Sequence, residues 1–184
     1  MTNVLTDEVL SRLARTDADA FSELYRRHVA QIYRYHLART GQLEDAEDLT
    51  AQTFMTALES IRNYRGQAAF LSWLFGIASH KLADYYRRRK PTTSLEVAAE
   101  LAENQPSLDE ITDHRQRMRQ VAKALESLAP ERAEALVLRL FGGLSAVEAG
   151  LVMGKSAAAV KMLVYRGLKD LQHSLCTGLE TNHE

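Results

Sequence analysis

The sequence predicts an all-α protein of two small helical domains, joined by a flexible acidic linker, with a helix-turn-helix in the second domain. Apolar residues recur at spacings of three and four along much of the 184-residue chain, as on one face of an α-helix. Glycine or proline interrupts these runs where a helix would end. No long apolar run has the alternating pattern of a strand, so an all-β fold is disfavoured.

Charge divides the chain, although its formal net charge is only −1. Residues 91–113 hold six acids and no base, whereas residues 17–90 and 114–176 carry net charges of +2 and +5. Two basic segments on either side of an acidic segment suggest a partner with a phosphate backbone. We divide the chain into an N-terminal extension at 1–16, a first domain at 17–90, a linker at 91–107, a second domain at 108–176 and a tail at 177–184.

Three helices are predicted in the first domain. The first covers residues 18–38 and ends at Gly41, because glycine tolerates the left-handed conformation that follows a helix. The second covers about 43–62, and the third covers about 68–89, where Pro91 stops it. The residues expected to face inward from these helices include Tyr25, Leu58 and Trp73.

Four helices are predicted in the second domain, at about 108–128, 131–141, 145–153 and 156–175. Pro130 closes the first of them, and the pair Gly142-Gly143 closes the second. Gly154 separates the last two helices.

Residues 144–169 have the pattern of a helix-turn-helix, whose second helix enters the major groove of DNA. Ser145 and Ser156 can cap the two helices, and Gly150 is small where they would cross. The second helix would present a recognition face made by Lys155, Ser156, Ala158, Lys161, Met162, Tyr165, Arg166 and Lys169. A helical hairpin with a solvated basic face is the alternative interpretation.

Two stretches of the first domain also suit nucleic acid. Residues 84–90 end the third helix with a basic run that contains two tyrosines, and residues 63–66 (Asn-Tyr-Arg-Gly) form a predicted loop. The ring, amide and cation of that loop suit an unstacked base. A solvated helix end and an ordinary polar loop are the alternatives, because cations also favour a helix C-terminus.

Four acids near the start of the second helix, Glu44, Asp45, Glu47 and Asp48, suit either a solvated first turn or a docking surface for a basic partner. No glycine loop or nearby histidine supports a metal site there. The sequence contains no nucleophile elbow, phosphate-binding loop or paired cysteines. We therefore expect a protein that is not an enzyme and that takes no cofactor, metal or small-molecule substrate.

The sequence offers no sign of export or membrane insertion. Its only cysteine, Cys176, cannot form an internal disulfide. No stretch approaches the ~20 apolar residues of a membrane span, and the polar first residues lack the apolar core of a signal peptide. A cytoplasmic location is therefore expected.

Three stretches occur in the order found in one protein family. They are residues 45–54 (DAEDLTAQTF), residues 64–90 (from YRGQAAF to YYRRRK) and residues 125–171 (from LESLAPE to YRGLKDL). At these separations they resemble the bacterial extracytoplasmic-function sigma factors. These are the minimal sigma-70-type initiation factors, with regions 2 and 4 only.

The resemblance implies a sigma factor that binds core RNA polymerase and directs it to promoter DNA. Docking on the β′ clamp would fall to Asp45, Glu47, Asp48, Leu49 and Gln52. Contact with the −10 element, including capture of a flipped base, would fall to Asn63, Tyr64, Arg65, Gly66, His80, Lys81, Asp84, Arg87 and Arg88. The recognition face of residues 144–169 would read the −35 element, while flanking helices hold the β flap. The acidic linker would run through the RNA exit path, and an anti-sigma factor is implied as a further partner.

Several positions depart from the pattern usual in the family. Residues 158–163 (Ala-Ala-Val-Lys-Met-Leu) replace the usual Gly-Thr-Val-Lys-Ser-Arg, so reading of the −35 element would depend more on Lys161, Tyr165, Arg166 and DNA shape. Gly150 also stands where Ala is usual.

A phosphorylation hypothesis follows from another departure. Ala51-Gln52 stands where the family usually has Gln-Glu, and Thr50 and Thr53 lie beside it. Phosphate on either threonine could substitute for the missing glutamate charge.

Two other functions agree with parts of the sequence. A stand-alone helix-turn-helix regulator would use residues 144–169 but would leave the first domain without a role. Such a regulator should bind a DNA duplex tightly without polymerase. A protein-interaction module that sequesters polymerase or a regulator would keep its activity after charge reversal of Lys161, Arg166 and Lys169.

Overall fold

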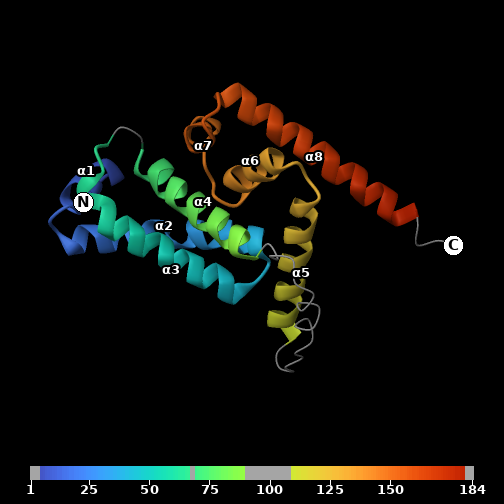
Figure 1. The fold of residues 1–184 in the computed structure, drawn as a ribbon, viewed down its shortest axis with the longest axis horizontal. Helices are drawn as coiled ribbons and strands as arrows, with labels where there is room; N and C mark the ends of the chain where they lie inside the picture. Colours follow the sequence, from blue (N-terminus) through green and yellow to red (C-terminus); the bar gives the residue numbers. More distant parts are fainter. Residues whose placement is uncertain (1–4, 67–68, 90–108, 181–184) are drawn as a thin grey trace.

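The computed structural model describes residues 5–66, 69–89 and 109–180, and within these ranges the chain forms helices and no strands (Figure 1). The predicted all-α class is confirmed. The helices are α1 (Asp7–Leu13), α2 (Ala18–Thr40), α3 (Leu43–Ser60), α4 (Phe70–Arg89), α5 (Asp109–Glu126), α6 (Pro130–Leu140), α7 (Ala146–Met153) and α8 (Ala157–Glu180), with a short 3-10 helix η1 (Ile61–Asn63) after α3.

Helices α2, α3 and α4 pack together as the bundle of the first domain (Figure 1). At the start of α2 the Asp17 carboxylate accepts a hydrogen bond from the backbone N–H of Asp19 (2.8 Å), which caps the helix. Leu24, Ile32 and Leu74 are fully buried between these helices. The predicted end of α2 is confirmed, because Gly41 follows it in the left-handed conformation.

The N-terminal extension contains a helix that the sequence interpretation missed. Helix α1 packs against α2 and α4, and its Leu10 is buried in the same core. Its Asp7 carboxylate accepts a hydrogen bond from the guanidinium of Arg27 (3.0 Å) and lies 2.6 Å from Nε2 of His28. The signal was available, since Thr6 caps α1 through the N–H of Val9 and apolar residues follow at helical spacing.

Helices α5 to α8 form the second domain and pack on the first. The Tyr35 hydroxyl of α2 donates a hydrogen bond to Glu134 of α6 (2.8 Å), and Arg39 lies 3.4 Å from the same carboxylate. The Gln31 amide donates to the backbone carbonyl of Gly142 (3.2 Å). The two domains therefore share one continuous core in this structure. The predicted linker at 91–107 lies outside the described residues, so its flexibility stays a prediction.

His36 is buried in α2 against α3. Its Nε2 lies 3.1 Å from Oγ1 of Thr53, and the Thr53 hydroxyl donates its own proton to the carbonyl of Leu49 (2.7 Å). Nε2 of His36 must therefore be the donor, which identifies the neutral tautomer of the ring. Burial lowers the pKa of His36 to about 3.

This lowered pKa predicts a loss of stability in mild acid. Unfolded His36 takes up a proton below pH ~6.5, whereas the folded ring does not until about pH 3. The folded state therefore loses about 2.5 kcal/mol at pH 4.5 relative to pH 7, at roughly 1.4 kcal/mol per pH unit below the unfolded pKa. We expect wild type to lose that much more free energy of unfolding than His36→Gln over this interval in urea titrations. Equal losses in the two proteins would contradict the assignment.

Candidate nucleic-acid interface

The loop after η1 presents an aromatic ring that packs against two other aromatic rings. Tyr64 donates its backbone N–H to the carbonyl of Ile61 (3.1 Å), and Ile61 is buried. The half-buried Tyr64 ring lies 4.9 Å from the ring of Trp73 and 6.0 Å from that of Phe70, measured between centroids. Burial raises the pKa of Tyr64, and the negative charge of Glu8 raises it further. The supported ring offers a platform on which an unpaired base can stack.

Polar groups surround this platform as the sequence predicted. Asn63, Arg65 and Gly66 are all exposed beside Tyr64. Trp73, expected in the core, is half-buried and packs against the core from its edge. The loop can therefore combine stacking with an amide that reads the edge of a base.

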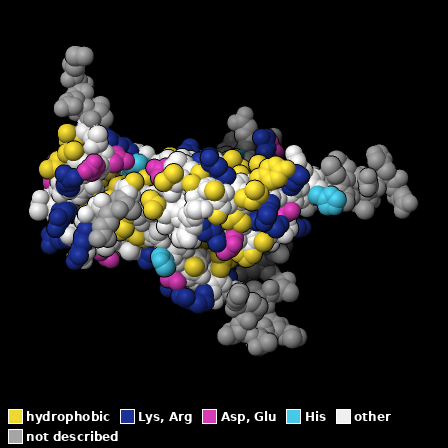
Figure 2. Space-filling model, turned by 90° about the horizontal axis from the view of Figure 1, so that it is seen from above, with side chains coloured by type: hydrophobic (Ala, Val, Ile, Leu, Met, Phe, Trp, Pro, Cys, Tyr) yellow, Lys and Arg dark blue, Asp and Glu magenta, His cyan; other side chains and the backbone are white. Residues whose placement is uncertain are grey.

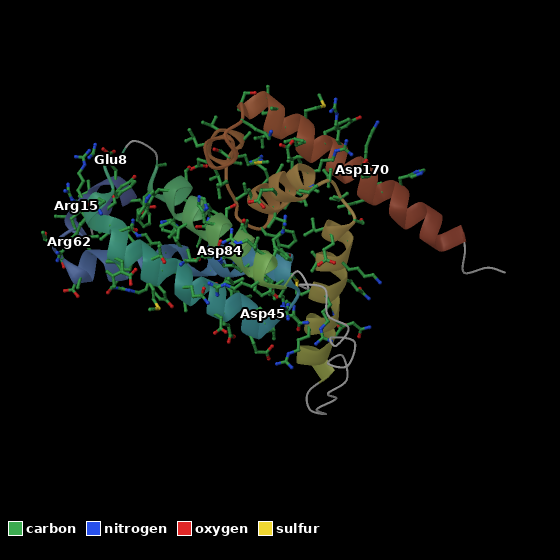
Figure 3. The ribbon with its side chains drawn as sticks, in the orientation of Figure 1. Glu8, Arg15, Asp45, Arg62, Asp84 and Asp170 are labelled. Carbon is green, nitrogen blue, oxygen red and sulfur yellow. The ribbon has the colours of Figure 1, made fainter. Side chains whose placement is uncertain are left out.

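Helix α4 continues this surface on one face. His80, Asp84, Arg87 and Arg88 recur at helical spacing, and Figure 3 marks Asp84 on this helix. His80, Arg87 and Arg88 are exposed, whereas Lys81 and Asp84 are half-buried. Arg87 donates a hydrogen bond to the Asp84 carboxylate (2.5 Å), so Asp84 offsets part of the positive charge of this face.

The acidic face of α3 is narrower than expected. Glu47, Asp48 and Gln52 are exposed, but Asp45 is half-buried and bonded to α4. Its carboxylate accepts hydrogen bonds from the Tyr85 hydroxyl (2.6 Å) and from Arg89 (3.2 Å), which ties α3 to the end of α4 (Figure 3). Burial, together with this hydrogen bond, raises the pKa of Tyr85 well above its usual value.

Two expectations about α3 are corrected by burial. Leu49 is 2% exposed and belongs to the core, so it does not form part of the exposed face. Thr50 and Thr53 are 6% and 0% exposed, and their hydroxyls donate to the carbonyls of Ala46 and Leu49. A kinase needs an accessible hydroxyl, so this structure contradicts the phosphorylation hypothesis.

Apolar residues on α3 reveal a feature that the sequence interpretation missed. Met55 is 62% exposed and lies seven residues after Asp48, on the same face of the helix. Leu58 and Tyr25, expected to face inward, are also exposed. The sequence could have indicated this exposure, because Met55 lies at helical spacing from Asp48. The acidic face thus continues into an apolar patch.

The predicted helix-turn-helix is present in α7 and α8. Ser145 accepts a hydrogen bond from the N–H of Glu148 (3.2 Å), while Glu148 accepts one from the N–H of Ser145 (2.7 Å). This capping box starts α7, and Ser156 caps α8 through the N–H of Ala159 (3.2 Å). Gly154 forms the left-handed turn between the helices.

The recognition face is exposed along α8 with one exception. Every predicted member except Lys155 is exposed, namely Ser156, Ala158, Lys161, Met162, Tyr165, Arg166 and Lys169. Lys155 is half-buried and pairs with Glu131 of α6 (2.8 Å). The ammonium of Lys169 lies 5.0 Å from the centre of the Tyr165 ring. This face can contact phosphates and base edges in the major groove.

The described part of the chain contains neither a cluster of histidine, cysteine and carboxylate residues that could hold a metal ion nor a helix able to cross a membrane.

Comparison with known proteins identifies both domains. A family model of sigma-70 region 2 matches residues 24–92, and a model of sigma-70 region 4 matches residues 118–171. The ECF RNA polymerase sigma factor BldN of Streptomyces coelicolor is 34% identical over 173 residues, which span 91% of this chain and 65% of BldN. The RNA polymerase sigma factor CarQ of Myxococcus xanthus is 30% identical, over 85% of this chain and 90% of CarQ.

A solved structure agrees with these sequence matches. The structure of CnrH in complex with the cytosolic domain of CnrY matches 93% of this chain and 97% of its own chain, with a TM-score of 0.75 and 25% identity. The family models and the relatives match the same two domains that the exposed surfaces occupy. The chain therefore belongs to the extracytoplasmic-function sigma factors of the sigma-70 family.

Proposed function

We propose that this protein binds core RNA polymerase and directs it to promoters, with its second domain on the −35 element and its first domain on the −10 element. One observation carries the proposal: the same chain presents the exposed acidic face of α3, the half-buried Tyr64 ring in its exposed loop and the exposed recognition face of α8. A partner enzyme and two DNA sites can then be held together by one molecule.

Recognition of the −35 element falls to α8. Lys161, Arg166 and Lys169 supply cations for phosphates or guanine edges, and Met162 and Tyr165 add apolar contact area. Since Ala158 carries no polar group, shape and deformability of the duplex contribute to the choice of sequence.

Strand opening at the −10 element falls to the first domain. A base that leaves the stack can rest on the Tyr64 ring, with Asn63 at its edge and Arg65 near its phosphate. This capture offsets an unpairing cost of a few kcal/mol. The exposed face of His80, Arg87 and Arg88 on α4 would line the adjoining duplex.

Polymerase carries out the chemistry in this proposal. Glu47, Asp48 and Gln52 would meet the β′ clamp, with Met55 beside them, while helices of the second domain hold the β flap. The sigma factor supplies binding and strand separation, and polymerase performs nucleotidyl transfer.

An anti-sigma factor belongs to the same proposal. CnrH, which this chain matches in fold, was solved with the cytosolic domain of CnrY bound. A protein of this kind would compete with polymerase for the exposed faces of both domains.

Transcription in vitro tests the proposal. Core RNA polymerase would be incubated with fragmented genomic DNA from the source, with and without this protein, and RNA 5′ ends would be mapped. We expect discrete new start sites that share two upstream motifs at fixed spacing. No new starts, together with no co-elution with core polymerase, would leave the stand-alone helix-turn-helix regulator as the better explanation.

Charge reversal on α3 tests the polymerase contact. Glu47→Lys with Asp48→Lys places two cations opposite a basic partner, so we expect affinity for core polymerase to fall by about tenfold or more. Fluorescence competition with labelled protein measures this affinity. The control, Glu8→Lys with Asp19→Lys, changes the net charge equally at exposed positions outside this face and outside the second domain. Equal affinities of the two variants would contradict the assignment.

A further inference from the structure

A further basic surface lies at the end of the first domain, and it contains none of the residues assigned above. Arg12, Arg15, Thr16 and Arg62 line an open hollow of about 600 Å³. Figure 2 shows Lys and Arg side chains gathered at the end of the molecule where α1 lies, and Figure 3 places the labelled Arg15 and Arg62 there together. Two segments far apart in sequence, the α1–α2 turn and η1, therefore bring their arginines to one place.

Among the described residues, two of the three arginines in this hollow are not held in ion pairs. Arg15 and Arg62 are exposed, and neither forms an ion pair within residues 5–66, 69–89 and 109–180. Arg12 pairs with Glu8 one turn earlier on α1. Arg15, Thr16 and Arg62 also border a neighbouring hollow of about 380 Å³, which Asp17 and Glu59 border as well. Neither of these two acids lines the larger hollow.

The hollow is continuous with the base-capturing loop. Arg62 is the residue immediately before Asn63, and η1 carries both of them. Glu8, on the same helix as Arg12, is close enough to Tyr64 for its charge to raise the pKa of that ring's hydroxyl. A strand whose base rests on Tyr64 therefore has its neighbouring backbone within reach of these arginines.

We propose that Arg15 and Arg62, assisted by Arg12, bind a backbone phosphate of the same unpaired strand, adjacent to the captured base. A guanidinium offers paired donors that match the oxygens of a phosphate, and the Thr16 hydroxyl borders the same hollow. The contact is independent of sequence and fixes the position of the strand, whereas the loop reads the base. This inference rests on the proposed function.

The test uses holoenzyme and a promoter with a pre-opened bubble, taken from a start site mapped as above. The non-template strand carries a neutral methylphosphonate at one linkage at a time. We expect wild type to lose affinity at one or two linkages beside the captured base. Arg15→Gln with Arg62→Gln should bind the unmodified strand about tenfold more weakly and lose that sensitivity. The slope of log affinity against log salt concentration should fall by about 0.7, the value expected for one lost phosphate contact on a single strand.

Two further variants separate this contact from charge and folding effects. Arg34→Gln removes an exposed arginine that lies about 24 Å along α2 from the residues of the hollow, at 1.5 Å per residue, and should bind like wild type. Glu8→Gln removes a negative charge beside the hollow and frees Arg12, so binding should become about twofold tighter. An unfolded variant cannot bind more tightly than wild type.

The outcomes distinguish the two proposals. Wild-type holoenzyme that does not bind the bubble contradicts the proposed function, and this inference with it. If wild type binds but the double arginine variant binds equally well, the phosphate contact alone is overturned. It is also overturned if Arg34→Gln weakens binding as much, or if sensitivity to the neutral linkages is unchanged in the double variant.

Discussion

Replacing Lys161, Arg166 and Lys169 with glutamine is expected to reduce transcription from the promoters of this sigma factor by about a hundredfold. All three cations are exposed on one face of α8, and none of them pairs with a carboxylate within the described residues. At about 1 kcal/mol for each lost contact, three contacts amount to about 3 kcal/mol, or two powers of ten in affinity. The slope of the log binding constant against log salt concentration should become less steep by about 2.7. Each lost phosphate contact on duplex DNA accounts for about 0.9 of this change.

The control for this variant removes exposed positive charge outside every face assigned above. Arg26 and Arg34 are exposed on α2, and their replacement with glutamine should leave promoter transcription within about twofold of wild type. Both variants should bind core polymerase normally, as measured by co-elution. If the α8 variant retains full activity, then α8 does not read DNA, and a protein-interaction module explains the chain better.

The helices could be predicted because their signals are local. The apolar spacing of residues 18–38 and the glycine after them placed α2 within two residues of its observed end at Thr40. The recognition face was predictable for the same reason. Once Val160 is assigned to the core, the helical period directs Lys161, Tyr165 and Lys169 outward, and Val160 is fully buried.

The burial of the acids near the start of α3 could not be predicted from their spacing alone. Four nearby acids were treated as one docking surface, but consecutive residues of a helix point about 100° apart. Asp45 and Leu49, four residues apart, both lie on the inner side, whereas Glu47 and Asp48 point outward. The Tyr85 hydroxyl that holds Asp45 lies forty residues further along the chain, so sequence spacing does not indicate it.

The packing of the two domains against each other could not be predicted from the sequence either. The contact of Tyr35 with Glu134 joins residues 99 positions apart, and either side chain alone suits an exposed surface. A helical period identifies an apolar face without saying what covers it. Leu58 was assigned to the core on its period, yet it is about half exposed on a patch with Met55.

Gly150→Ala is expected to destabilise the protein by about 2 kcal/mol, although alanine favours helices over glycine by up to ~1 kcal/mol. A Cβ built on Gly150 would lie 2.5 Å from the backbone carbonyl oxygen of Lys155. That oxygen belongs to the turn between α7 and α8, and the turn is fixed by the Lys155 N–H bonded to the Gly150 carbonyl (2.9 Å). No side-chain rotation relieves such an overlap, so the turn itself must shift. Overpacking of this kind costs about 1–3 kcal/mol, which exceeds the gain in helix propensity.

Alanine at Gly76 should stabilise the protein instead, because a Cβ built there meets no atom within 4 Å. Gly76→Ala, inside α4, should raise the free energy of unfolding by about 0.5–1 kcal/mol. Urea unfolding of both variants compares the two signs directly. Transcription should fall only for Gly150→Ala, since a shifted turn misplaces the start of the recognition helix. If Gly150→Ala matched or exceeded wild type in stability, close helix crossing would not explain the glycine that stands where the family usually has alanine.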